Sequence, residues 1–211
     1  VSGDTVNIDG QEYSRDNAAI CLNKTKVKGT VTKPDGTPLY DLSVKVYTDN
    51  NFNNQFNITG SNSGGGLYKL MTEGYGKLSY YVYDNSSELY GFSAITDVTI
   101  NEDGSYSVNE TPYSFGETQT LNLHLPALQF KGKIYDSDGT TIQSNSYIVI
   151  RDAEENVVRK YQLFNRNALN GVFLIGGLPD GTYSLYAESA DQIRSSESKE
   201  IEIDGANIMV D

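Results

Sequence analysis

Apolar and polar residues alternate with a period of two along much of the chain, which predicts β-strands. Leu42, Val44 and Val46 share one face of an extended segment, as do Ile148 and Ile150. The best helical candidate, 152–162, lacks a sustained apolar stripe, and we assign it to a strand edge and loop. Short strands separated by Gly, Asn and Asp turns are typical of β-sandwiches. The pattern therefore predicts an all-β protein.

Turn residues mark the ends of the predicted strands. The strand expected over 26–32 runs into Pro34-Asp35-Gly36, and a later strand begins after Pro179-Asp180-Gly181. Proline fixes φ in such turns and glycine accepts a positive φ. Both segments are therefore predicted to be tight turns.

The chain contains an internal repeat. Gly29 recurs as Gly132 and Asp35 recurs as Asp138, in both cases 103 residues later, and Tyr68 is matched by Phe173. A period near one hundred residues is too long for a solenoid unit of about 20 to 50 residues and fits a duplicated domain.

The repeat predicts how the chain is divided. We expect a first sandwich domain over 26–126, a second over 127–211, and a preceding strand segment over 1–25. The last segment has two open interpretations: it closes a preceding repeat, or it adds strands to the first domain. Because the junction between the two domains is short, we expect little hinge motion there.

The motifs that carry the repeat resemble a known group of domains. These are Val27-Lys28-Gly29-Thr30-Val31 with Asp35-Gly36-Thr37-Pro38-Leu39, and Phe173-x-Ile175-x-Gly177-Leu178-Pro179-x-Gly181-x-Tyr183. They are similar to the carboxypeptidase regulatory-like domains and to the related collagen-adhesin B-type, transthyretin-like domains. The resemblance implies two tandem immunoglobulin-like (prealbumin-like) β-sandwich domains.

Composition excludes several classes of partner and bond. The formal net charge is −12, and no run of Lys or Arg could follow a phosphate backbone or an anionic lipid surface. Cys21 is the only cysteine, so an intramolecular disulfide is impossible. No apolar stretch reaches the roughly 18 to 20 residues that span a bilayer. We expect neither nucleic-acid binding nor membrane insertion.

The residues needed for common catalytic and metal sites are scarce. His124 is the only histidine, and its place between Leu123 and Leu125 indicates an outward-facing strand residue rather than a catalytic base. One histidine and one cysteine do not make a conventional zinc site. We predict no enzyme and no cofactor, with calcium in the Asp-rich and Asn-rich loops at 49–51 and 84–85 left open.

Tyrosines are the best candidates for ligand contact. Tyr81 and Tyr83 share one face of a predicted strand while Tyr80 and Val82 share the other, so one set is expected in the core and the other could be exposed. An exposed row would suit stacking on sugar rings, although the chain has no tryptophan. The candidate ligand-binding residues are Tyr75, Tyr81, Tyr83 and Tyr90.

These observations favour a non-catalytic module of a secreted or cell-surface bacterial protein. Its expected role is structural or adhesive: it spaces or presents other domains of the same polypeptide. The alternative is a carbohydrate-binding accessory module that uses exposed tyrosines. Possible external partners are therefore a glycan or an extracellular protein.

Overall fold

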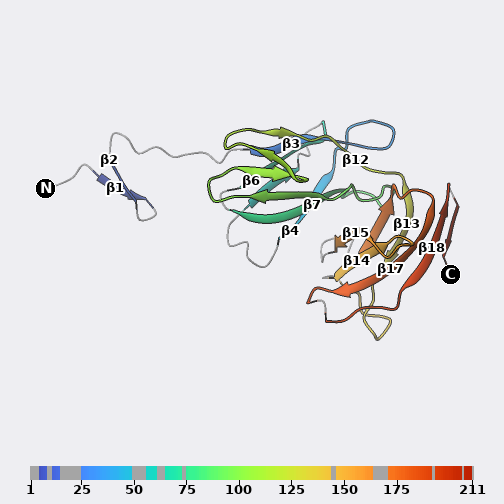
Figure 1. Ribbon diagram of the computed structural model, residues 1–211. Helices are drawn as coiled ribbons and strands as arrows, with labels where there is room; N and C mark the ends of the chain where they lie inside the picture. Colours follow the sequence, from blue (N-terminus) through green and yellow to red (C-terminus); the bar gives the residue numbers. More distant parts are fainter. Residues whose placement is uncertain are drawn as a thin grey trace.

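A computed structural model describes residues 5–8, 11–14, 25–48, 56–60, 65–72, 75–143, 146–163, 171–191, 193–205 and 207–210. The described residues form strands, turns and bends, with no helix among them, so the all-β prediction is confirmed (Figure 1). The strands fall into separate sheets on either side of residues 125–127. We call 25–125 the first half and 126–210 the second half.

The first half consists of two sheets. One has the order β10-β9-β8-β7-β4, and the other has the order β11-β3-β6-β5 with β12 also paired to β3. The strands are β3 (Thr25–Thr32), β4 (Leu42–Thr48), β5 (Phe56–Gly60), β6 (Leu67–Thr72), β7 (Gly76–Asp84), β8 (Thr96–Ile100), β9 (Tyr106–Val108), β10 (Thr111–Tyr113), β11 (Gln119–Thr120) and β12 (Leu123–His124).

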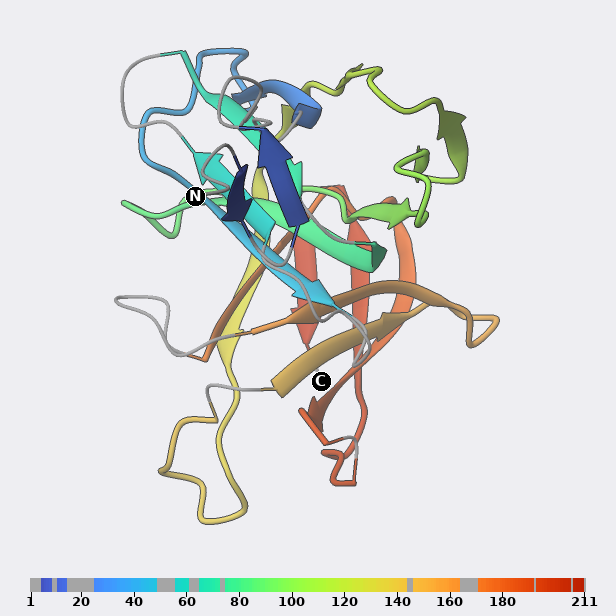
Figure 2. The same ribbon diagram turned by 90° about the vertical axis from the view of Figure 1, so that its left-hand side faces the viewer.

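The second half also consists of two sheets. A two-stranded sheet pairs β13 with β16, and a five-stranded sheet has the order β15-β14-β17-β18-β19. The strands are β13 (Leu128–Lys133), β14 (Ser146–Arg151), β15 (Val157–Gln162), β16 (Val172–Gly176), β17 (Gly181–Ser189), β18 (Lys199–Asp204) and β19 (Asn207–Val210). Figure 2 shows these strands, yellow to red, below those of the first half.

The N-terminal segment contains a hairpin of its own. β1 (Thr5–Ile8) and β2 (Gln11–Ser14) pair with each other in a separate two-stranded sheet. In the described part of the chain neither strand joins a sheet of the first half, and both interpretations of the segment stay predictions. Cys21 lies outside the described residues.

Alternation along the strands produces the core of the first half. β8 has the burial pattern expected of a strand with one inward face: Val98 and Ile100 are buried and Asp97 is exposed. Its inward residues join a cluster with residues of its neighbour β7 and with residues of β3 and β6 from the facing sheet. Burial of side chains of this size contributes roughly 1.5 to 3 kcal/mol each, which is the main force holding the two sheets together.

The duplicated sequence folds with a duplicated strand pairing. The antiparallel pair β3–β6 is matched by β13–β16, and the run β4-β7-β8-β9 is matched by β14-β17-β18-β19. Two differences stand out: β5 pairs with β6 in the first half whereas β15 pairs with β14 in the second half, and β10, β11 and β12 have no counterpart among the described strands. β5 and β15 occupy the same place in the order of strands along the chain, yet they belong to different sheets.

Both copies of the Asp-Gly-Thr motif form the same turn. The Asp35 carboxylate accepts hydrogen bonds from the Thr37 N–H at 2.9 Å and hydroxyl at 2.7 Å, and Asp138 accepts N–H groups of Thr140 and Thr141. Gly36 has a φ of 82°, a conformation that favours glycine. The turn predicted at Pro34-Asp35-Gly36 is confirmed.

Candidate functional site

β7 is buried on both faces, which changes the meaning of its tyrosines. Tyr80 and Val82 point into the core of the first half, and each has an exposure of 0%. Tyr81 and Tyr83 point the opposite way, yet their exposures are only 1% and 8% because they belong to a cluster that contains residues of the second half. An exposed row made of Tyr81 and Tyr83 is therefore not present.

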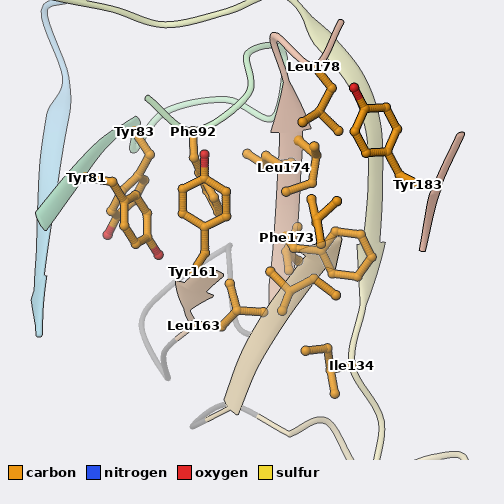
Figure 3. Packing of buried hydrophobic residues seen from close by; sticks show 14 of the residues in the cluster. Tyr81, Tyr83, Phe92, Ile134, Tyr161, Leu163, Phe173, Leu174, Leu178 and Tyr183 are labelled. Carbon is orange, nitrogen blue, oxygen red and sulfur yellow. The ribbon is translucent and has the colours of Figure 1, made fainter. Parts of the chain in front are cut away.

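The cluster between the halves is built from aromatic rings. Tyr81, Phe92 and Tyr161 form its centre, with ring centroids 4.8 Å apart for Tyr81–Phe92, 5.0 Å for Tyr81–Tyr161 and 5.3 Å for Phe92–Tyr161. Both contacts of Tyr161 are edge-to-face, an arrangement that aromatic quadrupoles favour. Figure 3 shows Tyr81 and Phe92 beside Tyr161, with Leu174 next to them from β16. The core of the second half thus continues into the first half.

Tyrosine hydroxyls donate hydrogen bonds in both directions across this boundary. The Tyr81 hydroxyl donates to the Gln162 carbonyl at 2.8 Å, and the Tyr161 hydroxyl donates to the Ser93 carbonyl at 3.1 Å. The hydroxyl of Tyr47 donates to the Lys160 carbonyl at 3.2 Å. Buried hydroxyls need such partners, so the polar ends of these rings fix the relative position of the two halves.

The main chain also joins the two halves. The Phe92 N–H donates to the Leu174 carbonyl at 2.9 Å, so the segment after β7 lies along β16. Gly91 lies directly against Gly176: a Cβ on Gly91 would come within 2.6 Å of the Gly176 nitrogen. At the rim, the Lys131 ammonium contacts the Glu88 carboxylate at 2.7 Å.

Burial controls the acid–base behaviour of the buried tyrosines. Loss of solvent raises the pKa of the Tyr161 phenol to about 12 from its ordinary value of 10.0, partly offset by Arg159. The same cause raises the pKa of Tyr81 well above 10.0, with smaller effects from Tyr83, Tyr47 and Tyr161. Both phenols are therefore neutral donors at neutral pH.

The other two candidate tyrosines lie elsewhere. Tyr75 is 54% exposed and immediately precedes β7. Tyr90 is half-buried: its ring packs against the core of the first half and the Lys33 ammonium lies 5.9 Å from its centroid. The four candidates do not form one surface, and ligand contact by Tyr75 and Tyr90 stays a prediction.

A pocket of about 680 Å³ opens in the second half, at one end of the sheet formed by β14 and β17. Within its lining the Arg194 guanidinium contacts the Asp136 carboxylate at 3.0 Å, and Gln143 donates to the same carboxylate at 2.6 Å. The pKa of Asp136 is held below its ordinary value, chiefly by the Ser137 N–H and then by Gln143. The lining residues are Ile134, Tyr135, Asp136, Ser137, Gln143, Ser146, Ala187, Glu188, Ser189, Ile193, Arg194, Ser195 and Ser196.

The structure also locates the histidine and most of the possible metal ligands. His124 is exposed while Leu123 and Leu125 are buried, as the alternation predicted. Within the described residues no three His, Cys, Asp or Glu side chains come together as a metal-ligand group. The Asp84 carboxylate accepts hydrogen bonds from Ser86 and Ser87, so it stabilises a turn. Residues 49–51, the other calcium candidate, lie outside the described part.

Sequence reasoning missed Tyr161 and Phe92. Tyr161 lies on β15, in the segment assigned to a strand edge and loop because of its charges, and Phe92 follows β7 in a stretch without alternation. Tyr161 does carry a signal, because it is the one aromatic residue of the edge strand β15 and follows the charged pair Arg159 and Lys160.

Comparisons with known proteins give little further information. No protein-family model and no curated protein matches the chain. A solved structure titled "The Bacillus anthracis TIE protein" is 19% identical, with a TM-score of 0.30 over 86% of this chain. The chain spans 31% of that protein's length, and a likeness this weak supports no argument about fold or function. The described residues contain no helix that is long and apolar enough to cross a membrane.

Proposed function

We propose that this chain is a non-catalytic structural or adhesive module made of two tandem immunoglobulin-like β-sandwich domains, divided near Pro126. It belongs to a secreted or cell-surface bacterial protein, where it holds other domains of the same polypeptide at a fixed distance and angle. The observation that carries this proposal is the aromatic cluster around Tyr81, Phe92 and Tyr161, which both halves build together.

A shared core supports the role of a spacer for a physical reason. Domains joined by a small polar contact move relative to one another, whereas a large apolar contact suppresses that motion. Here Tyr81, Phe92 and Tyr161 have exposures of 1%, 3% and 2%. Separating the halves would expose these rings to water and break the hydrogen bonds of their hydroxyls.

Small-angle scattering of the whole chain tests the proposal. One rigid arrangement of the two halves should fit the data for the wild type, and Tyr161→Ala should require a wider distribution of shapes. A matched control is Tyr75→Ala, since Tyr75 is an exposed residue outside the cluster. Wide interdomain motion in the wild type would contradict a spacer role, and hydrolytic turnover by the pure chain would contradict a non-catalytic one.

The adhesive part of the proposal needs a binding measurement. A panel of glycans and extracellular-matrix proteins, with and without calcium, should be screened against the chain. Binding to a matrix protein would support adhesion. A glycan signal that Tyr75→Ala removes would favour the carbohydrate-binding alternative, and silence across the panel would leave the spacer role alone.

A further inference from the structure

β13 has an outer edge that its counterpart in the first half keeps covered. β3 pairs with β6 on one side and, in parallel, with β11 and β12 on the other. β13 pairs with β16 in a sheet of two strands, and the described part of the chain supplies no strand on its other side. Val27 of β3 is fully buried, whereas its counterpart Phe130 of β13 is half-buried.

The main chain of Lys131 points to this outer edge. The Leu174 carbonyl accepts the Phe92 N–H, so it is directed away from β13. Lys131 lies directly opposite Leu174, and opposite residues of an antiparallel pair point both inward or both outward. The counterpart of Lys131 is Lys28, whose carbonyl accepts the Leu121 N–H at 2.8 Å. The main-chain groups of Lys28 bind a neighbouring strand in the first half, and those of Lys131 are directed to the outer edge of β13 in the second half.

The pocket of the second half lies at the end of the same edge. Ile134 and Tyr135, which follow β13, line it. Their counterparts Val31 and Thr32 pair with Leu123 and His124 of β12. Three more lining residues have counterparts in the core of the first half. Gln143 corresponds to Leu39, because each donates its N–H to the carbonyl of a matched residue, Ile134 or Val31. The strand registers match Ser146 with Leu42 and Ala187 with Val82.

The second half has a hollow there because it lacks side chains that fill the same position in the first half. In the first half, Leu123 and Leu125 belong to the same buried cluster as Leu39, Leu42 and Val82. In the second half the three counterparts are smaller or polar, and the leucine-bearing strand has no equivalent among the described residues. The pocket of about 680 Å³ therefore lies at the position where those side chains pack in the first half.

We propose that the outer edge of β13 and the adjoining pocket form a docking site for an extended segment of a partner protein. The segment adds as a strand parallel to β13, and alternate apolar side chains enter the pocket as Leu123 and Leu125 enter the core of the first half. Strand addition of this kind takes its affinity from main-chain hydrogen bonds and its specificity from pockets for alternate side chains.

The charge of Lys133 favours a partner segment with an acidic residue at one position. In the first half, the Asn122 side-chain oxygen accepts the Thr30 N–H at 3.1 Å and hydroxyl at 3.0 Å. Lys133 stands at the position of Thr30 and is exposed. A carboxylate at the position of Asn122 would pair with this lysine, so the partner segment has the pattern apolar, acidic, apolar, polar, apolar.

A synthetic peptide with the sequence of residues 117–125 carrying Asn122→Asp tests the proposal on the whole chain. It should bind, protect the Lys131 amide from hydrogen exchange and raise the melting temperature. The same peptide with Asn122→Lys should bind roughly three- to tenfold more weakly because two lysines then face each other. Equal binding of both peptides, or no binding, overturns the proposal.

Two variants of the chain localise the binding. Lys131→Pro removes the outward N–H and crowds the edge, while the pairing with β16 does not use that group. It should abolish peptide binding, and Lys131→Ala should keep it within roughly twofold, since only the exposed contact with Glu88 is lost. Binding retained by Lys131→Pro contradicts the site. Dimerisation of the free chain that Lys131→Pro prevents would instead assign the edge to a second copy and overturn the partner proposal.

Discussion

The ring of Tyr161 meets the ring of Tyr81 edge-to-face, with centroids 5.0 Å apart and planes at 78°. The two residues are 80 positions apart in the sequence and lie in different halves of the molecule. Each hydroxyl donates to a carbonyl of the opposite half, Tyr81 to Gln162 and Tyr161 to Ser93. Neither half can move away from the other without losing both the ring contact and the two hydrogen bonds.

Truncation of Tyr161 should therefore uncouple the halves. Tyr161→Ala leaves a cavity in the shared cluster and should lower the free energy of unfolding by about 3 to 5 kcal/mol. Tyr161→Phe keeps the ring but leaves the buried Ser93 carbonyl without this donor, so a loss of about 1 to 2 kcal/mol is expected. Urea unfolding measures both values. An unchanged midpoint for Tyr161→Ala would show that the contact does not hold the halves together.

Gly91 offers a steric test of the same contact. An added Cβ would approach the Gly176 nitrogen to 2.6 Å, a distance that requires the main chains to separate. Gly91→Ala should lower the free energy of unfolding by about 1 to 3 kcal/mol and should widen the shape distribution measured by scattering. The exposed Thr120→Ala serves as control. Wild-type behaviour of Gly91→Ala would contradict the close approach.

Alkaline pH should weaken the protein through its buried tyrosines. The folded state raises the pKa of Tyr161 to about 12 from 10.0, so the neutral phenol is favoured in the fold. The contribution of the neutral Tyr161 phenol to the free energy of unfolding is complete below pH 10. It is lost as pH rises from 10 towards 12, at about 1.4 kcal/mol per pH unit. Tyr81 adds to this loss because its pKa is also raised. The free energy of unfolding should fall less steeply with pH in this range for Tyr161→Phe than for the wild type. The same slope in both proteins would contradict a raised pKa for Tyr161.

Tyr81 should not stack on sugar rings, because its side chain is buried. Because it is 1% exposed, Tyr81→Ala should lower stability by about 3 to 5 kcal/mol. Tyr75→Ala should change stability by less than about 0.5 kcal/mol, since Tyr75 is exposed. Thermal unfolding of the two variants distinguishes these cases. Any loss of glycan binding in Tyr81→Ala has to be corrected for unfolded protein, whereas Tyr75→Ala reports on contact directly.

Much of the fold could be predicted because local chemistry determines it. The alternation in β4, β14 and β17 and the Asp-Gly turns depend on side-chain direction and φ preferences that nearby residues set. β5 lies in a segment rich in Asn and Gly, where composition alone predicts a loop. Phe56 and Ile58 are the only alternating signal there, and so short a pattern becomes a strand because β6 offers its edge.

The site could be predicted only in part, and for a different reason. A period of two shows that Tyr81 and Tyr83 share one face of β7, but it does not show what covers that face. The cover is Tyr161 and its neighbours, which belong to the second half and are distant from β7 in sequence. The pairing of β15 is local by contrast, because β15 forms a hairpin with β14 that the turn from Asp152 to Asn156 closes.

Residual dipolar couplings of the backbone amides test the central claim most directly, because they report the relative orientation of the two halves in solution. If Tyr81, Phe92 and Tyr161 hold the molecule as one body, a single alignment tensor should fit the amides of 25–125 and 126–210 together. Tyr161→Ala should then require two tensors. Two tensors of different magnitude for the wild type would show independent motion and contradict the rigid spacer.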